Sequence, residues 1–353
     1  MRVLNVMSSK ILGGLEQVFL DYNKALSSKG YTVFAMYNKY GKIKNKLEEL
    51  PSVKYISKLF FRPYILLFPF MFFTVLRLRP NLIIVHSRKV LPLFTKIGFI
   101  LRIPVAIVTH NTKLKLLHKA DYIFSITKYQ KDIFVSNNFD PEKIFVVPNM
   151  VSFNKDYKEL TEYSNLPVIG VMGRFDPMKG FIPFISSCNI LKSRGVKFKI
   201  KISGSPQMQY IDEYKKLKRV VRYCNLQNDT EFTGWIDNKD DFFNNIDIFV
   251  LPSVYEPFGI ILLEAMMYSK PIISSLAEGP REIFNNTEAA LTYEPKDHIK
   301  LADLMEEMIK NIDLAKKTAK NGYDLVNSKY TLEEIANVLE KAVQNAINRK
   351  KWI

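Results

Sequence analysis

Two glutamates separated by an apolar stretch form a motif that could do chemistry. Residues 256–264 read EPFGIILLE, with Glu256 and Glu264 eight positions apart and no polar side chain between them. A glycosidase-type acid–base pair holds its carboxyl groups about 5–10 Å apart, whereas eight residues of helix rise about 12 Å. The spacing therefore fits two acids that hold opposite ends of one extended ligand.

Two cations mark a second stretch, PVIGVMGRFDPMKGF, at residues 167–181. Arg174 directly follows an apolar run, and Lys179 comes five residues later, before a predicted helix. Taken alone, these would be solvated loop charges. Two cations beside a helix N-terminus also make a diphosphate site, and the glutamate motif supplies a second strand–loop–helix unit, in which Gly259 lets backbone N–H groups face anionic oxygens. The two stretches together favour a nucleotide site.

The first half of the chain offers weaker candidates. Gly13 and Gly14 precede a predicted helix, where backbone N–H groups could approach a phosphate or a sugar, although a Gly-Gly pair is as often an ordinary loop. His86 and His110 each follow an apolar run. A histidine at the end of a strand is more often structural than functional. The residues alone leave both interpretations of each histidine open.

Short apolar runs alternate with helical patterns along nearly the whole chain, which is typical of parallel sheets covered on both faces. The predicted strands lie within 2–9, 31–38, 82–87, 104–111, 121–127, 143–149, 167–174, 198–205, 230–235, 246–253, 271–276 and 289–294. The alternation pauses at the polar segment 151–166. We therefore predict two doubly wound, Rossmann-like α/β domains, at 1–160 and 161–330. The tail, 331–353, begins with a Thr-x-x-Glu capping box and continues as a helix that could cross back to the first domain.

Composition restricts the class of protein. The 353 residues are 47% apolar, as expected of a globular chain. Cys188 and Cys224 have no metal-like spacing and form no disulfide framework, which favours a reducing compartment. The start, MRVLNVMSS, lacks the apolar core of a signal peptide and is better interpreted as a first strand.

Charge is distributed unevenly between the two halves. Residues 1–150 hold 23 Lys and Arg against 8 Asp and Glu, a net charge of +15, whereas the remainder holds 28 against 27, a net charge of +1. A basic proteome would explain lysine enrichment but not its confinement to one half. Anionic membrane and nucleic acid are both candidate partners for the basic half.

Residues 59–76, LFFRPYILLFPFMFFTVL, depart from the pattern because they are rich in aromatic residues and flanked by basic ones. Only 14 uncharged residues separate Arg62 from Arg77, fewer than the roughly 18–20 needed to span a bilayer, and Pro63 and Pro69 break a long helix. One interpretation is a core helix, and another is an apolar face that dips into lipid headgroups. Both could hold, with one face buried and the other exposed.

Seven motifs in order carry a resemblance to a known family. They are GGLEQ at 13–17, VTHN at 108–111, VPNMV at 147–151, GRFDPMKG at 173–180, FTGW at 232–235, EPFGIILLE at 256–264 and GPREI at 279–283. In order and spacing, the chain resembles the family 4 retaining glycosyltransferases of GT-B fold over essentially its whole length. The resemblance implies two Rossmann-like domains that face each other across a cleft.

The resemblance also implies roles in donor binding. Arg174 and Lys179 match the basic pair that grips the donor diphosphate. Glu264 matches the acid that binds the ribose hydroxyls, and Glu256 the acid near the transferred sugar. The donor-binding group further takes in Phe258, Gly259 and Ile260, where backbone groups meet sugar and phosphate.

On the acceptor side, His110 matches a histidine near the reacting carbon, and Gly13 and Gly14 match the loop that closes over acceptor and phosphate. His110, Glu256, Arg174 and Lys179 are thus the implied catalytic group. Two departures concern sugar and acceptor choice rather than reaction class. The family's G-G-x-P-E is E-G-P-R-E here, which leaves the role of Glu278 open, and Gln17 replaces a frequent basic residue.

The implied function is a retaining, metal-independent glycosyltransferase with no cofactor. Its expected partners are a nucleotide-sugar, with UDP as the expected nucleotide, a glycan or glycolipid acceptor such as lipopolysaccharide, and an anionic membrane bound through the basic half. No nucleic acid partner is expected. The expected location is the cytoplasmic face of the inner membrane. The alternatives are a nucleotide-sugar epimerase of similar fold, which would need no acceptor, and a basic nucleic-acid-binding protein, which would bind nucleic acid at physiological salt.

Overall fold

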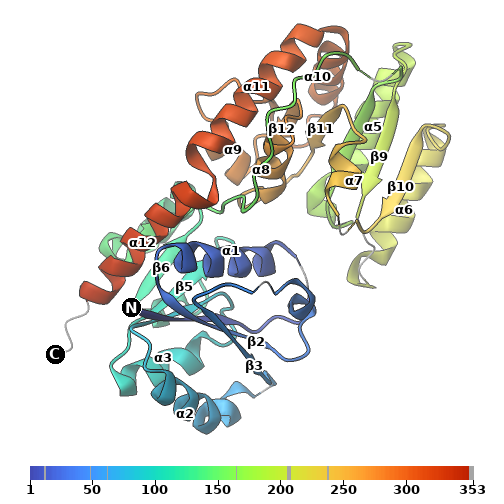
Figure 1. Cartoon of the computed structure of the whole chain (residues 1–353). Coiled ribbons are helices and arrows are strands. Elements are labelled where there is room, and N and C mark those ends of the chain that lie inside the picture. Colours follow the sequence, from blue (N-terminus) through green and yellow to red (C-terminus); the bar gives the residue numbers. More distant parts are fainter. Residues whose placement is uncertain are drawn as a thin grey trace. The chain divides into compact units, whose positions relative to one another are not determined.

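The computed structural model describes residues 1–11, 13–47, 49–61, 63–163, 165–204, 208–236 and 238–349, and of Ile65 it describes the backbone alone. The chain divides into two compact units, Met1–Phe153 with Tyr330–Ile353 (unit 1) and Asn154–Lys329 (unit 2). Each unit is built on a parallel sheet, as Figure 1 shows for each by itself. The predicted fold class, two doubly wound α/β domains, is confirmed.

Unit 1 contains a seven-stranded sheet in the order β3-β2-β1-β4-β5-β6-β7. Its strands are β1 (Arg2–Met7), β2 (Thr32–Asn38), β3 (Val53–Lys58), β4 (Leu82–Val85), β5 (Val105–Thr109), β6 (Tyr122–Ser125) and β7 (Ile144–Val146). All neighbouring pairs are parallel. The strand order reverses between β1 and β4, and such a switch point is where open α/β sheets bind ligands, at the carboxyl ends of the strands.

Helices cover both faces of this sheet. They are α1 (Gly14–Ser28), α2 (Phe68–Leu78), α3 (Leu91–Leu101), α4 (Lys128–Ser136) and α12 (Leu332–Asn348), with short 3-10 helices η1 (Lys42–Lys46), η2 (Tyr64–Leu67), η3 (Leu117–Lys119) and η4 (Pro141–Lys143). Phe19 of α1 packs in a core on one face of the sheet, whereas Met71 of α2 and Phe94 of α3 pack in the core on the other (Figure 1).

Strand β3 was not predicted, although every predicted run does contain a strand. Its sequence, VKYISK, alternates lysines with apolar residues and lacks the continuous apolar run of the central strands. The strand forms one edge of the sheet and is nowhere fully buried. An edge strand with one solvated side needs fewer apolar residues, so its sequence signal is weaker.

The aromatic segment 59–76 has a buried side and an exposed side, and contact of the exposed side with lipid stays a prediction. Helix α2 buries Met71 and Val75 in the core, while Phe70 and Phe73 are 71% and 66% exposed. Pro69 lies in the first turn of α2, where a missing N–H costs no hydrogen bond. Arg62 lies outside the described residues. Among the helices that the structure describes, none is both long and apolar enough to cross a bilayer.

Unit 2 contains a six-stranded parallel sheet in the order β10-β9-β8-β11-β12-β13. Its strands are β8 (Val168–Met172), β9 (Lys199–Ser203), β10 (Thr230–Gly234), β11 (Ile248–Leu251), β12 (Ile272–Ser275) and β13 (Leu291–Tyr293). Its helices are η5 (Pro177–Lys179), α5 (Phe181–Ser193), η6 (Met208–Tyr210), α6 (Ile211–Tyr223), α7 (Asp240–Phe243), α8 (Ile260–Met267), α9 (Glu278–Ile283), α10 (His298–Lys310) and α11 (Ile312–Lys329). Cys188 and Cys224 are free thiols.

The chain passes into unit 2 after Phe153, seven residues before the expected boundary at 160. Lys155 forms an ion pair with Asp240 at 2.7 Å, and the N–H of Lys158 donates to Ser269 Oγ at 3.1 Å, so both already belong to unit 2. The passage between the units lies within the polar segment 151–166, at which the alternation of strands and helices pauses in the sequence.

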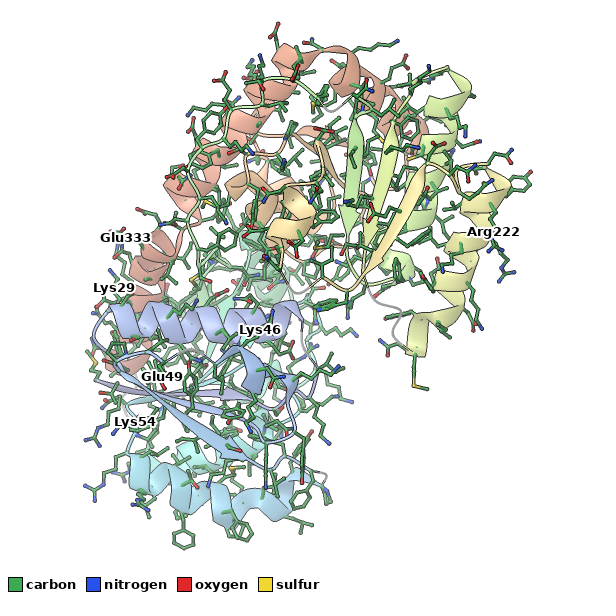
Figure 2. All side chains as sticks on the ribbon, turned by 45° about the vertical axis from the view of Figure 1, so that its right-hand side comes forward. Lys29, Lys46, Glu49, Lys54, Arg222 and Glu333 are labelled. Carbon is green, nitrogen blue, oxygen red and sulfur yellow. The ribbon has the colours of Figure 1, made fainter. Side chains whose placement is uncertain are left out.

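The tail returns to unit 1. Thr331 caps α12 by accepting a hydrogen bond from the N–H of Glu334, as the capping box predicted. The helix packs on α1, where Lys29 Nζ donates to Asn337 Oδ1 at 2.5 Å (Lys29 is labelled in Figure 2). Unit 1 is therefore assembled from both ends of the chain.

Candidate active site

The two predicted motifs of unit 2 meet at the switch point of its sheet. Arg174 and Lys179 follow β8, and Glu256 follows β11, the neighbouring strand on the other side of the reversal. Because the strands are parallel, both loops leave from the same carboxyl edge. Residues about 80 positions apart in the sequence thus share one edge of one sheet.

Backbone contacts hold these two loops together. The N–H of Val254 donates to the carbonyl of Met178 at 2.8 Å. Gly180 has a φ of 70°, and a Cβ on it would lie 1.9 Å from the carbonyl oxygen of Pro252. Only glycine satisfies both the left-handed backbone and the close approach. The glycine of the GRFDPMKG motif therefore seats the Lys179 loop against the loop that carries Glu256.

Lys179 and Glu256 form an ion pair in this seat. Lys179 Nζ lies 2.6 Å from Glu256 Oε2, with 20% and 11% of the two side chains exposed. A pair so largely removed from water interacts more strongly than a surface pair, and leaving either charge unpartnered there is costly. The structure thus brings together the predicted phosphate-binding cation and the predicted sugar-binding acid.

Arg174 occupies a different position from its predicted partner Lys179. Its side chain is 51% exposed, and its nearest charged partner is Asp176, at 3.7 Å. Asp176 itself caps the 3-10 helix η5 by accepting from the N–H of Met178. Arg174 therefore lies at the edge of the site with a weak, solvated partner, which leaves its guanidinium available to rearrange.

Helix α8 begins at Ile260, after the short loop Pro257–Gly259 that follows the first acid, Glu256. Gly259 has a φ of 102° and precedes Ile260, the first residue of the helix. A Cβ on Gly279 would lie 2.3 Å from the Cα of Phe258, and the N–H of Gly279 donates to the carbonyl of Glu256 at 2.9 Å. The glycine of the EGPRE motif thus supports the loop that carries the predicted donor-binding residues.

Glu264 lies further along α8 and is 4% exposed. Its Oε1 is paired with the ammonium of Lys239, a residue that the sequence analysis did not identify. Its Oε2 is buried without a hydrogen-bond partner among the described residues. A carboxylate with one paired and one unused oxygen can accept a further donor such as a hydroxyl. The signal for Lys239 was absent from the sequence because it lies in a polar turn, 25 residues before its partner.

Glu278, whose role the sequence left open, follows β12 at the start of α9. Its Oε2 is buried without a hydrogen-bond partner among the described residues. Among those same residues, no three His, Cys, Asp or Glu side chains are grouped so that they could hold a metal ion.

In unit 1, the two histidines lie against each other on the carboxyl edge. Their ring centroids are 5.7 Å apart with an interplanar angle of 27°. His86 Nε2 lies 2.8 Å from Asn5 Oδ1, and the Asn5 amide donates to Asn23 Oδ1. Since the Asn5 oxygen must accept, Nε2 of His86 carries the proton. Asn5 and Asn23 were not identified from the sequence, because single asparagines in a strand and a helix carry no pattern.

Burial keeps both imidazoles neutral. Removal from water lowers the pKa of His86 well below its ordinary value, and the nearby His110 lowers it further. Burial also lowers the pKa of His110 to about 4, and the charge of Arg88 adds to that effect. Near neutral pH each ring is therefore a hydrogen-bonding group rather than a cation.

Gly13 and Gly14 lie where the sequence placed them, ahead of a helix. Gly13 is the extended residue before α1, and Gly14 is the first residue of the helix. Leu12 lies outside the described residues. Gln17 Nε2 donates to Asp21 Oδ1 at 2.9 Å, so this side chain is used within α1.

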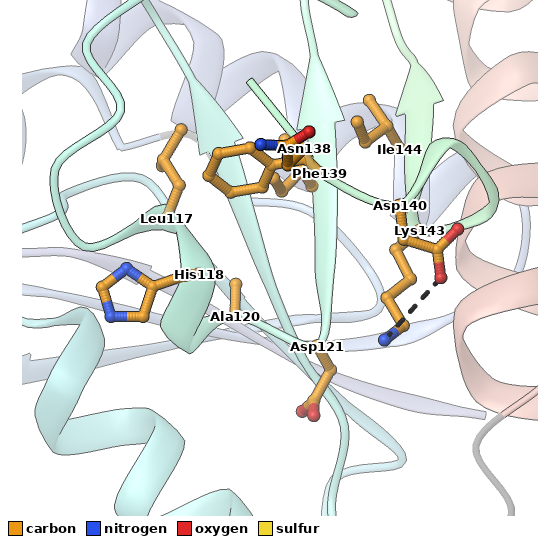
Figure 3. Close-up of a pocket in the computed structure, with 10 residues that line it drawn as sticks. Leu117, His118, Ala120, Asp121, Asn138, Phe139, Asp140, Lys143 and Ile144 are labelled. Carbon is orange, nitrogen blue, oxygen red and sulfur yellow. Dashed lines mark ion pairs between the residues drawn. The ribbon is translucent and has the colours of Figure 1, made fainter. Parts of the chain in front are cut away.

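A cavity of about 250 Å³ lies at the opposite edge of unit 1 (Figure 3). It is lined by residues such as Leu117 and Asp121, which precede β6, and Phe139 and Asp140, which precede β7. These lie at the amino ends of the strands, away from the edge that holds His86. None of the predicted site residues lines this cavity.

Comparison with known proteins agrees with this arrangement in both units. Residues 12–155 match the family described as Glycosyltransferase Family 4, and residues 152–325 match Glycosyl transferases group 1. The two matches are adjacent and together cover both units. The chain belongs to the GT-B glycosyltransferases. The resemblance read from the seven motifs is thereby confirmed.

Curated relatives of this GT-B member include enzymes of surface-polysaccharide synthesis. It is 25% identical over 182 residues to the lipopolysaccharide core biosynthesis glycosyltransferase LpsE of Rhizobium meliloti. This match covers 52% of this chain and 51% of LpsE. It is 27% identical over 241 residues to the capsular polysaccharide biosynthesis glycosyltransferase CapM of Staphylococcus aureus, which covers 65% of this chain and 62% of CapM. The chain thus spans about half to three fifths of the length of these relatives.

Solved structures share the fold over nearly the whole chain. HepE of Anabaena, solved in complex with UDP-glucose, superposes with a TM-score of 0.83 and 18% identity, which covers 98% of this chain and all of HepE. At that identity the likeness concerns the fold, and the GT-B fold is thereby confirmed.

Proposed function

We propose that this chain transfers a sugar from a nucleotide-sugar to a glycan acceptor. The observation that carries the proposal is the Lys179–Glu256 ion pair at the switch point of unit 2, directly before helix α8. In this proposal Lys179 is the phosphate-binding cation, the start of α8 supplies N–H groups, and Glu256 binds the sugar. Glu264, further along α8, accepts hydrogen bonds from the ribose hydroxyls. UDP is the preferred nucleotide, because HepE was solved with UDP-glucose on a similar fold.

The proposed reaction depends on charge that develops on the leaving group. When the bond between the sugar C1 and the phosphate oxygen breaks, the electron pair stays on the nucleoside diphosphate. Lys179, Arg174 and the N–H groups at the start of α8 stabilise this charge more in the transition state than in the ground state. Glu256 then accepts hydrogen bonds from hydroxyl groups of the sugar, while the ammonium of Lys179 pairs with the phosphate instead of with Glu256.

We further propose that the reaction retains the anomeric configuration and needs no metal. In this scheme the acceptor hydroxyl attacks C1 on the face that the phosphate leaves, and its proton passes to a phosphate oxygen. The two cations and the helix N-terminus supply the positive charge that a metal would otherwise bring. In this scheme Glu256 binds the sugar and is not the nucleophile.

The proposed acceptor is a membrane-associated glycan, such as lipopolysaccharide or a lipid-linked oligosaccharide, at the cytoplasmic face of the inner membrane. The named activities of LpsE and CapM support this class of acceptor. Unit 1 adds a physical argument, because its exposed aromatic residues include Phe70 and Phe73 of α2 and Phe99 of the neighbouring α3.

These exposed residues, together with Leu66 and Ile100, define the aromatic face of unit 1. No Asp or Glu occurs anywhere between residues 50 and 120, whereas Arg77 and Arg102 end the two helices. An apolar face with a basic border binds anionic bilayers through apolar insertion and charge attraction. We therefore propose an anionic membrane as its occupant.

A panel of nucleotide-sugars tests the proposed function. Each donor is mixed with the protein, first alone and then with a membrane extract, and release of nucleoside diphosphate is measured. Release from UDP-sugars that increases with extract is expected, together with thermal stabilisation by UDP. No release and no stabilisation by any nucleotide would reject the proposal. An isomerised donor formed without acceptor would instead identify an epimerase.

A further inference from the structure

A set of lysines on the carboxyl edge of unit 1 has no role in the function proposed so far. Lys10 follows β1, and Lys39, Lys42, Lys44 and Lys46 follow β2, the last three on the 3-10 helix η1. We name these five residues the lysine loop. None of them forms an ion pair within the part of the chain that the structure describes. Their charges are therefore available to a partner.

Contacts between the two segments keep these lysines together. The N–H of Lys42 donates to the carbonyl of Lys10 at 3.3 Å, and Lys10 Nζ lies 5.8 Å from the ring centroid of Tyr40. A Cβ on Gly41 would lie 2.9 Å from the carbonyl oxygen of Ser9, so the segments approach closely. The like charges are gathered by the fold at an electrostatic cost, which a bound anion would offset.

The opposite edge of the same sheet has a different charge pattern. There Asp140 pairs with Lys143 at 3.8 Å and Glu142 pairs with Arg349 at 2.7 Å. Figure 2 shows Lys46 on the other side of unit 1 from Lys29 and Lys54. Near the lysine loop, Glu49 is the nearest acid in sequence that the structure describes. Lys113 and Lys115, which follow His110, lie on the same carboxyl edge as the lysine loop.

We propose that the lysine loop binds anionic groups, phosphate or carboxylate, of the acceptor glycan. The proposal rests on the function proposed above. It also rests on the general rule that open α/β sheets bind ligands at the carboxyl ends of their strands, the edge that also holds Gly13, Gly14 and His110. It names the acceptor class as an acidic saccharide, whose charged groups the lysines hold while a neighbouring hydroxyl is presented for glycosylation.

The position of the loop favours a saccharide over the bilayer. Ile43, within η1, packs in the core on the α1 face of the sheet, with Phe19 and Leu20. The aromatic face lies on α2 and α3, which cover the other face of the sheet. Lipid headgroups that contact the aromatic face therefore meet the opposite side of the sheet from the lysine loop.

Binding to a soluble acidic oligosaccharide tests the proposal. Tetragalacturonate is the probe, and maltotetraose is its neutral counterpart. The variant Lys42→Gln/Lys44→Gln/Lys46→Gln is compared with Lys29→Gln/Lys54→Gln/Lys119→Gln, which removes the same charge at the amino edge. At physiological salt the loop variant is expected to bind tetragalacturonate about tenfold more weakly than the wild type, and the amino-edge variant less than twofold. Maltotetraose should bind weakly to all three proteins.

Three outcomes would overturn the inference. They are an unchanged affinity in the loop variant, an equal loss in both variants, and a loss confined to binding of anionic vesicles. An equal loss of tetragalacturonate affinity in both variants would mean that the general positive charge of unit 1 binds the probe, rather than a site. A loss of vesicle binding alone would mean that the lysine loop binds the membrane. UDP binding by the wild type is measured in parallel, so a failure of the proposed function is recognised separately.

Discussion

The two units share one architecture but differ in how they use charge. Unit 1 holds 27 Lys and Arg against 11 Asp and Glu, a net charge of +16, whereas unit 2 holds 24 against 24. In unit 2 the cations repeatedly meet acids, as in Lys179 with Glu256 and Arg194 with Asp303 and Glu306. In unit 1 the lysine loop meets none within the described residues.

This difference indicates that charge serves two purposes in one molecule. Unit 2 pairs many of its charges internally, and under the proposed function the donor would exchange partners with the preformed pair of Lys179 and Glu256. In unit 1 the lysine loop has no ion pair within the described residues, so its charges interact at longer range and depend on salt. The shared fold fixes where the loops lie, but it does not fix which charged residues the loops contain or whether those charges are paired.

The largest expected effect comes from breaking the paired site. Lys179→Ala should lower the turnover number of sugar transfer about 100-fold, because a preorganised donor to the leaving phosphate is lost. Steady-state kinetics with a UDP-sugar measures the change. Lys192→Ala, which breaks an ion pair with Asp229 elsewhere in unit 2, is the control. A Lys179→Ala enzyme with the wild-type rate would remove this lysine from the diphosphate site.

The next largest effect concerns unit 1 and its aromatic face. Phe70→Ser/Phe73→Ser should weaken binding to anionic vesicles about tenfold or more, because two exposed rings can no longer insert. The free energy of unfolding should change little. Met71→Ala, on the buried side of the same helix, should instead lower that free energy by about 2–4 kcal/mol. Vesicle sedimentation and urea denaturation separate the two. Wild-type sedimentation of the double variant would exclude the aromatic face as the membrane contact.

A smaller effect is expected at the other end of the donor site. Glu264→Ala should weaken UDP binding about tenfold, since charge-assisted hydrogen bonds to the ribose are lost. Binding of 2′-deoxy-UDP should weaken less, because that ligand has one hydroxyl fewer. Calorimetric titration of both ligands gives the ratio. Glu294→Ala, which breaks an exposed pair with Arg281, is the control. Equal losses for both nucleotides would place Glu264 away from the 2′-hydroxyl.

The smallest effect concerns the histidine pair of unit 1. Both pKa values are lowered in the folded state, that of His110 to about 4. Between pH 6.5 and pH 4 the unfolded chain therefore binds more protons than the folded one, so stability is lost as the pH falls through this window. His86→Asn should make the dependence of unfolding free energy on pH shallower by up to about 1.4 kcal/mol per pH unit. Urea denaturation at pH 5 and pH 7 measures it, and parallel profiles for the two proteins would contradict the assignment.

Much of the candidate donor site was predictable because its residues lie in motifs that local geometry requires. Gly180 and Gly259 have left-handed backbones, and Gly279 lies against the backbone of Phe258. Each position requires glycine, so these glycines appear in the sequence motifs that contain or neighbour Lys179 and Glu256. Lys239, Asn5 and strand β3 were missed. Their positions depend on partners distant in the sequence, and a lone lysine, a lone asparagine and a half-polar strand look like ordinary surface or core positions.

The sequence by itself determined the alternation of strands and helices, the reaction family and the unequal charge of the two halves, because these depend on composition and local spacing. The tertiary structure alone decided which charges are paired. Lys179 meets Glu256 and Lys239 meets Glu264 only because parallel strands bring distant loops to one edge. It also decided that α2 buries one side and exposes the other, since burial is a property of packing against neighbours and not of residue type.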